Sequence, residues 1–302
     1  MHDPSAAAAP VRRRRPRRGG PRHAAPEPGS GRHPGRWLAA GAAVLAVAVA
    51  VVLVVGPGRE DDGGPTSPAP AASSAARLAP DALVDWVRTQ LPAGGTVTAE
   101  PELRTALTEA GVDPAVLPES GADGDAGAPA LVLTGAPPGT GRVLARFDRP
   151  GEAGPLLLVD PAPVEPTDEE RERREALAAA VLANPTTAVE GDSRAVLESA
   201  DVDARLLSLV AALTAREGVG LWSFPLLPGE EPGAAPARRV VVDSLGGRPI
   251  PADGATTQRL VAWLDAQLAP FAPDVVEVTG EGVLVAFAYL PGPDAVVGEV
   301  SP

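Results

Sequence analysis

The sequence predicts an α/β or α+β extracytoplasmic domain, possibly made of two related modules, behind one transmembrane helix. Three observations predict it. Helical and extended patterns alternate from residue 80 onward. Residues 37–55 form an apolar run without a charged or polar side chain, and basic and acidic residues are separated along the chain. The 302 residues are 44% hydrophobic with a net charge of −13, which is enough for one or two globular domains.

The apolar run 37–55 has the length of one membrane crossing. Its sequence is WLAAGAAVLAVAVAVVLVV, and a helix of this length spans about 28 Å, close to the hydrocarbon thickness of a bilayer. A buried core helix is one alternative, but the neighbouring Pro-, Gly- and Arg-rich tail has no apolar surface to cover it. A cleaved signal peptide is another, since Ala46 and Ala48 form an Ala-x-Ala run. Cleavable signals usually have shorter apolar runs behind shorter leaders, so we predict an uncleaved anchor in the lipid bilayer.

The charge distribution predicts the orientation of this anchor. Residues 1–36 contain nine Arg against two acidic residues, whereas residues 56–302 contain 17 Arg against 37 acidic residues. The positive-inside rule then places the N-terminus in the cytoplasm and the acidic domain outside, in a single-pass plasma membrane protein. We expect 1–36 to be a disordered tail that acts as a topology signal; contact with anionic lipid is the alternative. No folded module or aromatic residue accompanies the basic run, so no nucleic-acid partner is expected.

Residues 56–79 are rich in Pro, Gly, Ser and Ala and predict a linker. Structure is expected to resume in a first module, residues 80–163. Apolar spacing and Pro or Gly stops predict helices over 80–91 and 101–111, and β-rich runs predict strands at 96–99, 130–134, 142–147 and 155–159.

A second module is predicted over residues 164–302. It begins with a capping box, Thr167 with Glu170, at the start of a helix to residue 183. Further helices are predicted at 193–200, 202–216 and 256–268, and strands at 187–190, 220–224, 239–243, 275–279 and 283–289, the last two as a hairpin around 280–282.

Two internal similarities indicate that the modules are related. Residues 100–117 and 190–207 share seven identities at a constant offset of 90, and residues 83–92 and 260–270 share Leu-Val-x-Trp followed by Gln-Leu. Duplication and chance in an Ala- and Leu-rich sequence both remain open. On either interpretation we expect Trp86 and Trp263 to anchor the core rather than to bind a ligand.

The composition excludes most catalytic chemistry. The chain has no Cys, all 26 of its cationic residues are Arg, and its three His lie at 2, 23 and 33. Thiolate nucleophiles, Cys-ligated zinc and Schiff-base lysines are therefore excluded. The run 131–147 resembles a P-loop, but Ala136, Arg142 and Val143 stand where the first Gly, the Lys and the Ser or Thr are needed. We predict a hairpin turn there and no nucleotide binding.

Carboxylates are the only acid–base groups left in quantity. Glu119, Asp123 and Asp125 could ligate calcium, but their spacing is not that of an EF-hand, and a solvated acidic loop is the simpler interpretation. The acidic run 168–170 is explained by stabilisation of a helix start. A glycosidase would need two facing carboxylates, usually with aromatic sugar platforms. The sequence therefore identifies no catalytic, cofactor-binding or metal-ligating residue and predicts no cofactor.

Two family resemblances can be stated. Residues 83–111 (LVDWVRTQLPAGGTVTAEPELRTALTEAG) resemble a helix–strand–helix segment in soluble parts of dolichol-phosphate-mannose-type membrane glycosyltransferases. The match covers under a tenth of the chain and lacks the multi-span catalytic domain, so it implies no transferase activity. Around LANP at 182–185 and VDARLL at 202–207, the chain also resembles uncharacterised single-pass envelope proteins of GC-rich bacteria.

Together these observations favour a membrane-anchored extracytoplasmic module of the bacterial cell envelope. We expect it to be a non-enzymatic binding or accessory module. Its partner would be an envelope protein or glycan. The alternative is a carboxylate-only hydrolase that acts on envelope glycan. Two opposed, partly buried carboxylates in a cleft would favour the enzyme, and carboxylates confined to loops and helix caps would favour the module.

Overall fold

A computed structural model describes residues 79–119, 129–149, 154–189 and 191–300, which all belong to one compact unit within residues 65–302. The predicted tail 1–36, the predicted transmembrane segment 37–55 and the linker up to residue 78 lie outside the described residues. Within the described ranges, no helix is both long and apolar enough to cross a membrane.

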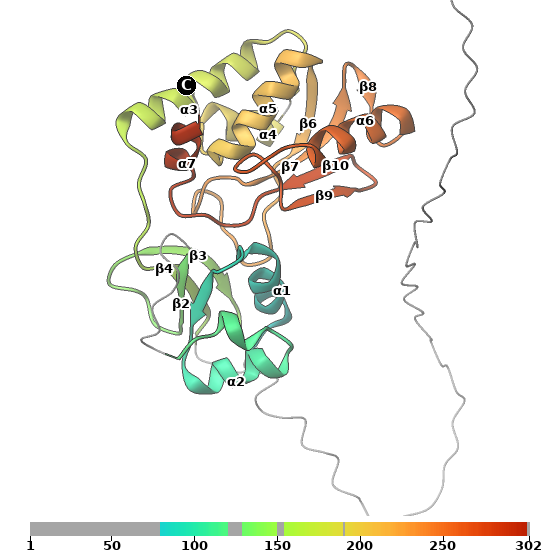
Figure 1. Cartoon of the computed structure of the whole chain (residues 1–302). Helices are drawn as coiled ribbons and strands as arrows, with labels where there is room; N and C mark the ends of the chain where they lie inside the picture. Colours follow the sequence, from blue (N-terminus) through green and yellow to red (C-terminus); the bar gives the residue numbers. More distant parts are fainter. Residues whose placement is uncertain (1–78, 120–128, 150–153, 190, 301–302) are drawn as a thin grey trace, which may run out of the picture. The chain divides into compact units, whose positions relative to one another are not determined.

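Two mixed β-sheets with accompanying helices form the described structure, which confirms a mixed α/β class (Figure 1). The first sheet has the order β1-β2-β4-β3, in which β1 and β2 are parallel and the other neighbours antiparallel. Its elements, in chain order, are α1 (Asp81–Gln90), β1 (Thr96–Thr98), α2 (Pro101–Glu109), the 3₁₀ turn η2 (Pro114–Val116), β2 (Ala130–Thr134), β3 (Arg142–Phe147) and β4 (Leu156–Asp160).

The second sheet has the order β5-β6-β7-β10-β9, with β8 paired to β7. Strands β5 and β6 are parallel, and the other pairs are antiparallel. Its elements are α3 (Asp168–Ala183), β5 (Ala188–Val189), α4 (Gly191–Glu198), α5 (Ala204–Arg216), β6 (Val219–Ser223), β7 (Arg239–Leu245), β8 (Arg248–Pro249), α6 (Gly254–Asp265), β9 (Val275–Val278), β10 (Val283–Ala286) and α7 (Pro293–Val300).

Apolar spacing, helix caps and Pro or Gly stops in the sequence located most elements correctly. The capping box at the start of α3 is present: Thr167 Oγ1 accepts a hydrogen bond from Glu170 N, and Glu170 Oε2 accepts one from Thr167 N at 2.8 Å. The predicted hairpin is the antiparallel pair β9–β10, in which Val278 lies opposite Val283. The short elements η2, β8 and α7 were not predicted. The first two have only three and two residues, and α7 is a Gly-containing stretch of eight, so their sequences show too little periodicity.

The hairpin predicted over 131–147 is wrong. Strands β2 and β3 do not pair with each other, since both pair antiparallel with β4, which lies between them. The segment 135–141 is therefore a crossover connection between two parallel strands. The physical reason lies in β4, all five residues of which are buried. A continuously apolar strand takes the central place in a sheet, and alternation within β2 and β3 cannot reveal that.

One hydrophobic cluster joins the first sheet to α1 and α2. Leu83 and Trp86 of α1 and Leu107 of α2 pack with Leu131 and Leu158 of the sheet, and each is at most 1% exposed. Tyr289, which follows β10, belongs to the same cluster. A residue from the end of the chain thus completes the core of the first sheet. The prediction that Trp86 anchors the core is confirmed.

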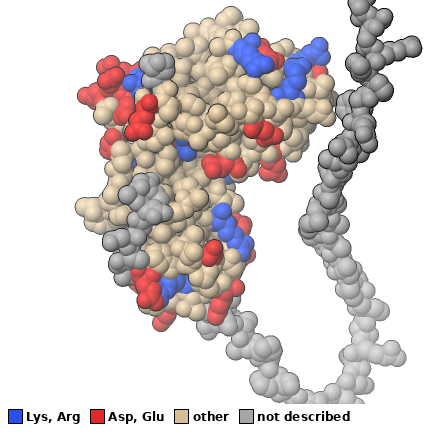
Figure 2. Space-filling view, viewed as in Figure 1, with Lys and Arg blue, Asp and Glu red and all other residues tan. Residues whose placement is uncertain are grey.

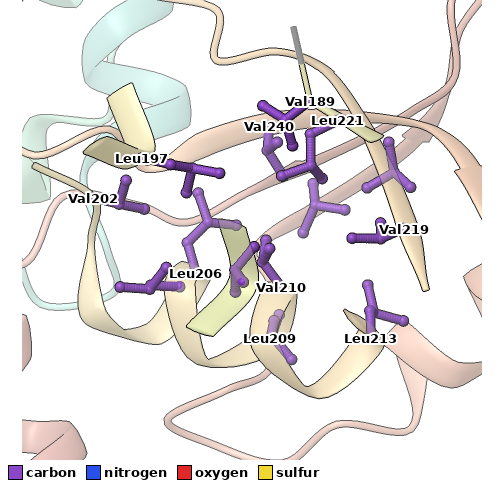
Figure 3. Packing of buried hydrophobic residues seen from close by; sticks show 14 of the residues in the cluster. Val189, Leu197, Val202, Leu206, Leu209, Val210, Leu213, Val219, Leu221 and Val240 are labelled. Atoms are coloured by element: carbon purple, nitrogen blue, oxygen red, sulfur yellow. The ribbon is translucent and has the colours of Figure 1, made fainter. Parts of the chain in front are cut away.

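The second cluster lies between α5 and the second sheet, with α3, α4 and α6 contributing to it. The apolar face of α5 is buried: Leu206, Val210 and Leu213 are at most 3% exposed. Figure 3 shows these side chains pointing toward Leu221 and Val240 of the sheet. Burial of each such side chain is worth about 1.5–3 kcal/mol, so this face supplies much of the stability of the second sheet.

Candidate functional site

The guanidinium of Arg238 connects the two sheets. Arg238 directly precedes β7, and its Nε donates a hydrogen bond to Gln90 Oε1 of α1 at 2.9 Å. Its Nη2 donates to Glu230, and the side chains of this pair are each only 6% exposed. Glu230 Oε1 also accepts a hydrogen bond from Trp86 Nε1 at 2.8 Å. The segment between β6 and β7 is thereby fixed to the helix that covers the first sheet.

Aromatic rings flank the same guanidinium. Its Cζ lies 5.7 Å from the Trp86 ring centroid and 5.8 Å from that of Tyr289. These distances are within the range in which a cation is attracted to an aromatic ring. The buried charge is therefore compensated by Glu230, by an amide oxygen and by two π-systems.

Tyr289 forms a second connection between the sheets. Its backbone N–H donates to Gln90 O at 2.8 Å, and its hydroxyl donates to Asp160 Oδ2, at the end of β4, at 2.5 Å. Burial, reinforced by the hydrogen bond to Asp160, raises the pKa of the Tyr289 hydroxyl well above its usual range. The phenol therefore stays protonated and remains a donor.

A third buried pair, Arg205 with Asp203, fixes the start of α5. Asp203 caps the helix by accepting from Arg205 N at 2.9 Å, and it accepts from Arg205 Nε and Nη2 at 3.0 and 2.7 Å. Arg205 Nη2 also donates to Ala288 O at 2.8 Å, and its Cζ lies 4.8 Å from the Phe287 ring centroid. This pair places the chain after β10 against α5.

A pocket of about 220 Å³ lies beside these three connections. Its lining comes from five parts of the chain: the start of β3, residues 164–174, residues 201–203, residues 233–238 and residues 289–294. Four guanidinium and four carboxylate groups line it: Arg142, Arg171, Arg174, Arg238, Glu165, Asp201, Asp203 and Asp294.

A glycine allows the rim of the pocket to close. Gly292 has φ +62°, a conformation that favours glycine, and a Cβ added there would lie 2.8 Å from Val164 Cγ1. The segment after Tyr289 can therefore pass close to the segment before α3. A larger residue at this position would force the rim apart.

Several of the charged groups in the pocket have protein partners. Arg142 pairs with Glu165 at 2.5 Å, and Arg171 pairs with Asp168 at 2.6 Å and donates to Pro166 O at 3.1 Å. Arg238 and Asp203 are engaged as described above. These contacts hold the walls of the pocket in place.

The pair Arg174–Asp294 is different. Arg174 Nε lies 3.2 Å from Asp294 Oδ1, and the two side chains are 12% and 7% exposed. Within the described residues, Arg174 Nε is a buried donor without a hydrogen-bond acceptor, whereas the Asp294 carboxylate accepts from its own backbone N–H. Burial raises the pKa of Asp294, and the charges of Glu170 and Asp203 act in the same direction against the lowering effect of Arg174.

This arrangement can bind and orient a small polar molecule. The carboxylates of Asp203 and Asp294 line one pocket in different environments, a pattern that acid–base catalysis also uses. Asp203, however, is held by three hydrogen bonds from Arg205. Within the described part of the chain, no group of three or more His, Asp or Glu side chains could hold a metal ion.

The acidic groups singled out in the sequence do not gather in this pocket. Glu119 lies 3.4 Å from Arg104 in an exposed pair, and Asp123 and Asp125 lie outside the described residues. The run 168–170 forms the first turn of α3, as expected for helix-start chemistry. Of the P-loop-like segment, Arg142 begins strand β3 rather than a helix, which is the context predicted for a segment that does not bind phosphate.

The pocket itself was missed by sequence reasoning. Its residues come from five separated stretches, and none of these carries the motif of a ligand-binding site. The available signals were weak: Arg238 directly before an apolar strand, and Asp203 with Arg205 at a helix start. Trp222 of β6 is 58% exposed, although the three residues before it in the strand are buried.

The surface gives no indication of a polyanionic or polycationic partner on the face that Figure 2 shows. Acidic side chains lie there in separate clusters among basic ones, and most of the visible surface carries neither. A continuous patch of one sign would be needed to steer a highly charged partner. The pocket is therefore the better candidate site.

Comparison with protein-family models, with curated proteins and with solved structures found no match to this chain. The resemblances of residues 83–111 and of the whole chain thus stay predictions. The function has to be argued from the geometry of the pocket.

Removal of the Glu230 charge should destabilise the fold. In Glu230→Gln, Arg238 would remain buried opposite a neutral group, and we expect the free energy of unfolding to fall by about 3–5 kcal/mol. Urea unfolding of the full-length protein measures this change. The matched control is Glu231→Gln, whose partner Arg146 is 50% exposed, with an expected change below about 1 kcal/mol. Equal losses in the two variants would contradict a central role for Arg238.

The raised pKa of Asp294 predicts a pH dependence of stability. Above the ordinary Asp value of 3.8, the folded protein retains a proton that the unfolded chain has released, so stability declines as pH rises through the raised pKa of Asp294. Asp294→Asn should reduce this decline, as measured by thermal unfolding at a series of pH values. Asp265→Asn, at an exposed position on α6, should leave the decline unchanged. An unaltered slope in Asp294→Asn would show that another group is responsible.

Proposed function

We propose that this chain is a membrane-anchored extracytoplasmic module of the cell envelope that binds a partner or small molecule and does not catalyse a reaction. The observation that carries the proposal is the polar pocket of about 220 Å³, in which most charged groups are held by protein partners. A site of fixed, mutually neutralising charges is suited to recognition. Cys, Lys and His, which many covalent and metal-assisted mechanisms use, are missing from the sequence beyond residue 33.

The proposed location rests on the sequence. Residues 37–55 would span the bilayer, the basic tail 1–36 would remain in the cytoplasm, and residues 56–79 would link the anchor to the domain. The acidic, Cys-free composition of the domain is compatible with an exported module that folds without disulfides.

We also propose that residues 80–163 and 164–302 are related modules. The parallel pairs β1–β2 and β5–β6 support this, because in each case a helix precedes the first strand and helical segments separate the two strands. The local geometry also repeats at the offset of 90: Asp113 Oδ1 accepts from Ala115 N, and Asp203 Oδ1 accepts from Arg205 N, each at 2.9 Å. Beyond these segments the strand orders differ.

A hydrolase that acts on envelope glycan is the second candidate. The observation in its favour is that Asp203 and Asp294 line the same pocket, with the pKa of Asp294 raised by burial. Against it, both carboxylates are paired with Arg side chains, and the aromatic residue of the pocket, Tyr289, uses its hydroxyl to hold Asp160. We therefore rank binding above hydrolysis.

The proposed topology can be tested by reporter fusions after residue 302. A reporter active only outside the cytoplasm should give signal, and one active only in the cytoplasm should not, because the positive-inside rule keeps the Arg-rich tail inside. Deletion of residues 37–55 should abolish the outside signal and serves as the control. Strong signal from the cytoplasmic reporter, or release of the protein from membranes by high salt, would contradict the anchor.

Incubation of the detergent-solubilised protein with purified envelope glycan distinguishes the two functions. We expect no release of reducing ends above the level of buffer. Asp294→Asn should give the same result as the wild type, since no proton transfer depends on it in a binding module. Release that the wild type produces and Asp294→Asn does not would establish the hydrolase instead.

A further inference from the structure

Strand β9 differs from the other strands that end the two sheets. Strand β1 has three residues and β5 only two, and β3 carries a register shift between Val143 and Ala145. The N–H of Arg146 in β3 also donates to Gly229 O at 2.7 Å. Short strands, bulges and covering segments are the ways in which proteins protect a sheet edge from pairing with another chain. Strand β9, in contrast, runs through four residues without a register shift at the end of the second sheet (Figure 1).

The outer side of β9 presents backbone groups that can pair with another strand. Thr279 N donates to Gly282 O at 2.8 Å, and hydrogen-bonded pairs alternate with non-bonded ones along an antiparallel ladder. Glu277 therefore belongs to the next hydrogen-bonded pair with β10, and the N–H and C=O groups of Val276 and Val278 point away from β10. Within the described ranges, no protein group forms a hydrogen bond with these four outward groups.

The side chains of this edge are apolar and acidic. Three of the four residues of β9 are Val, and Val278 is 51% exposed. Glu277 is exposed and forms no ion pair among the described residues, although its charge reaches Arg239 of β7. From residue 274 to residue 286 the chain contains three acidic residues and no basic one. A cationic partner is therefore the one whose charge complements this edge.

We infer that β9 is a docking edge for an extended basic segment of a partner polypeptide, which adds to the sheet as an antiparallel strand with an Arg or Lys opposite Glu277. Three consecutive residues suffice. The outer two pair with Val276 and Val278 and satisfy all four outward groups, and the central one faces Glu277. Opposite charges at facing positions of two strands stabilise their pairing. The inference concerns a surface other than the pocket and so goes beyond the proposed function.

A second copy of the chain suits this edge less well. Two β9 strands related by a two-fold axis use all of their outward groups only when Val276 of one copy pairs with Val278 of the other. That register places the two Glu277 carboxylates directly opposite each other, and like charges at facing positions are destabilising. The charge of β9 thus favours a basic partner over self-association.

The test is titration of a fluorophore-labelled peptide, Ser-Thr-Val-Arg-Val-Thr-Ser, with the full-length protein in detergent, followed by fluorescence anisotropy. We expect saturable binding. The same peptide with Glu in place of its Arg should bind at least about tenfold more weakly, because attraction to Glu277 becomes repulsion. Methylation of the backbone nitrogens of its two Val residues should weaken binding as much, because these donate to β9. Methylation of the Arg nitrogen, which points away from β9, should not.

Variants assign the site. Val278→Pro removes an outward N–H and leaves the pairing with β10 in place, since edge strands tolerate Pro at such positions, and it should weaken binding at least about tenfold. Glu277→Arg should reverse the preference, so that the Glu-containing peptide binds more tightly than the Arg-containing one. Glu281→Arg makes the same change of net charge in the adjoining turn and should keep the wild-type preference. If Val278→Pro fails to fold, the methylated peptides on the wild type still decide.

Three results would overturn the inference: no saturable binding of the Arg-containing peptide, equal binding of the peptide methylated at its Val nitrogens, or the wild-type preference in folded Glu277→Arg. Self-association of the wild type that Val278→Pro abolishes would assign the edge to a second copy and would overturn it as well. None of these results bears on the pocket, so the topology and glycan experiments decide the proposed function separately.

Discussion

The ion pair of Arg238 with Glu230 is the interaction on which the joining of the two sheets depends. It is almost completely buried, and its partners Trp86 and Gln90 come from α1, far away in the sequence. A buried pair adds little net stability over a well-packed apolar alternative, but loss of one partner is costly. The pair is thus better understood as selecting one way of docking the two sheets, because another docking would remove the hydrogen bonds that Trp86 and Gln90 form with it.

The pocket follows from this docking. Its lining includes Arg142 from the first sheet and residues 233–238 and 289–294 from around the second. The pocket therefore forms only when the two sheets are docked in this way. Tyr289 contributes to the first core, to the hydrogen bond with Asp160 and to the pocket wall. A frame of ion-paired charges around the pocket is the arrangement expected of a preorganised binding site, in which little ordering is left for the ligand to supply.

The sequence predicted local structure far better than assembly. Helix caps and stops depend on neighbouring residues, so the capping box at Thr167, the helix that contains α5 and the β9–β10 hairpin could be located. The pairing of β2 with β4 depends on which strand is apolar on both faces. The alternation of apolar and polar residues along a strand does not reveal this.

The pocket could not be predicted for a related reason. Arg174, Arg238 and Asp294 look like ordinary surface charges in the sequence, and only tertiary contacts bury them. No sequence motif therefore marks the site. The composition did limit the chemistry available to any site, because the absence of Cys and Lys is independent of the fold.

The contacts of α1 have a consequence for the order in which the protein can mature. Trp86 and Gln90 are synthesised long before their partners, which lie 144 and 148 positions further along the chain. Until residues 230–238 and Tyr289 arrive, the first sheet has an incomplete core and a Trp indole without its acceptor. Closure of so long a loop is entropically costly and slow. The first sheet therefore cannot complete its core before the second sheet forms. A truncation before residue 289 would leave it with an incomplete core, in an aggregation-prone state.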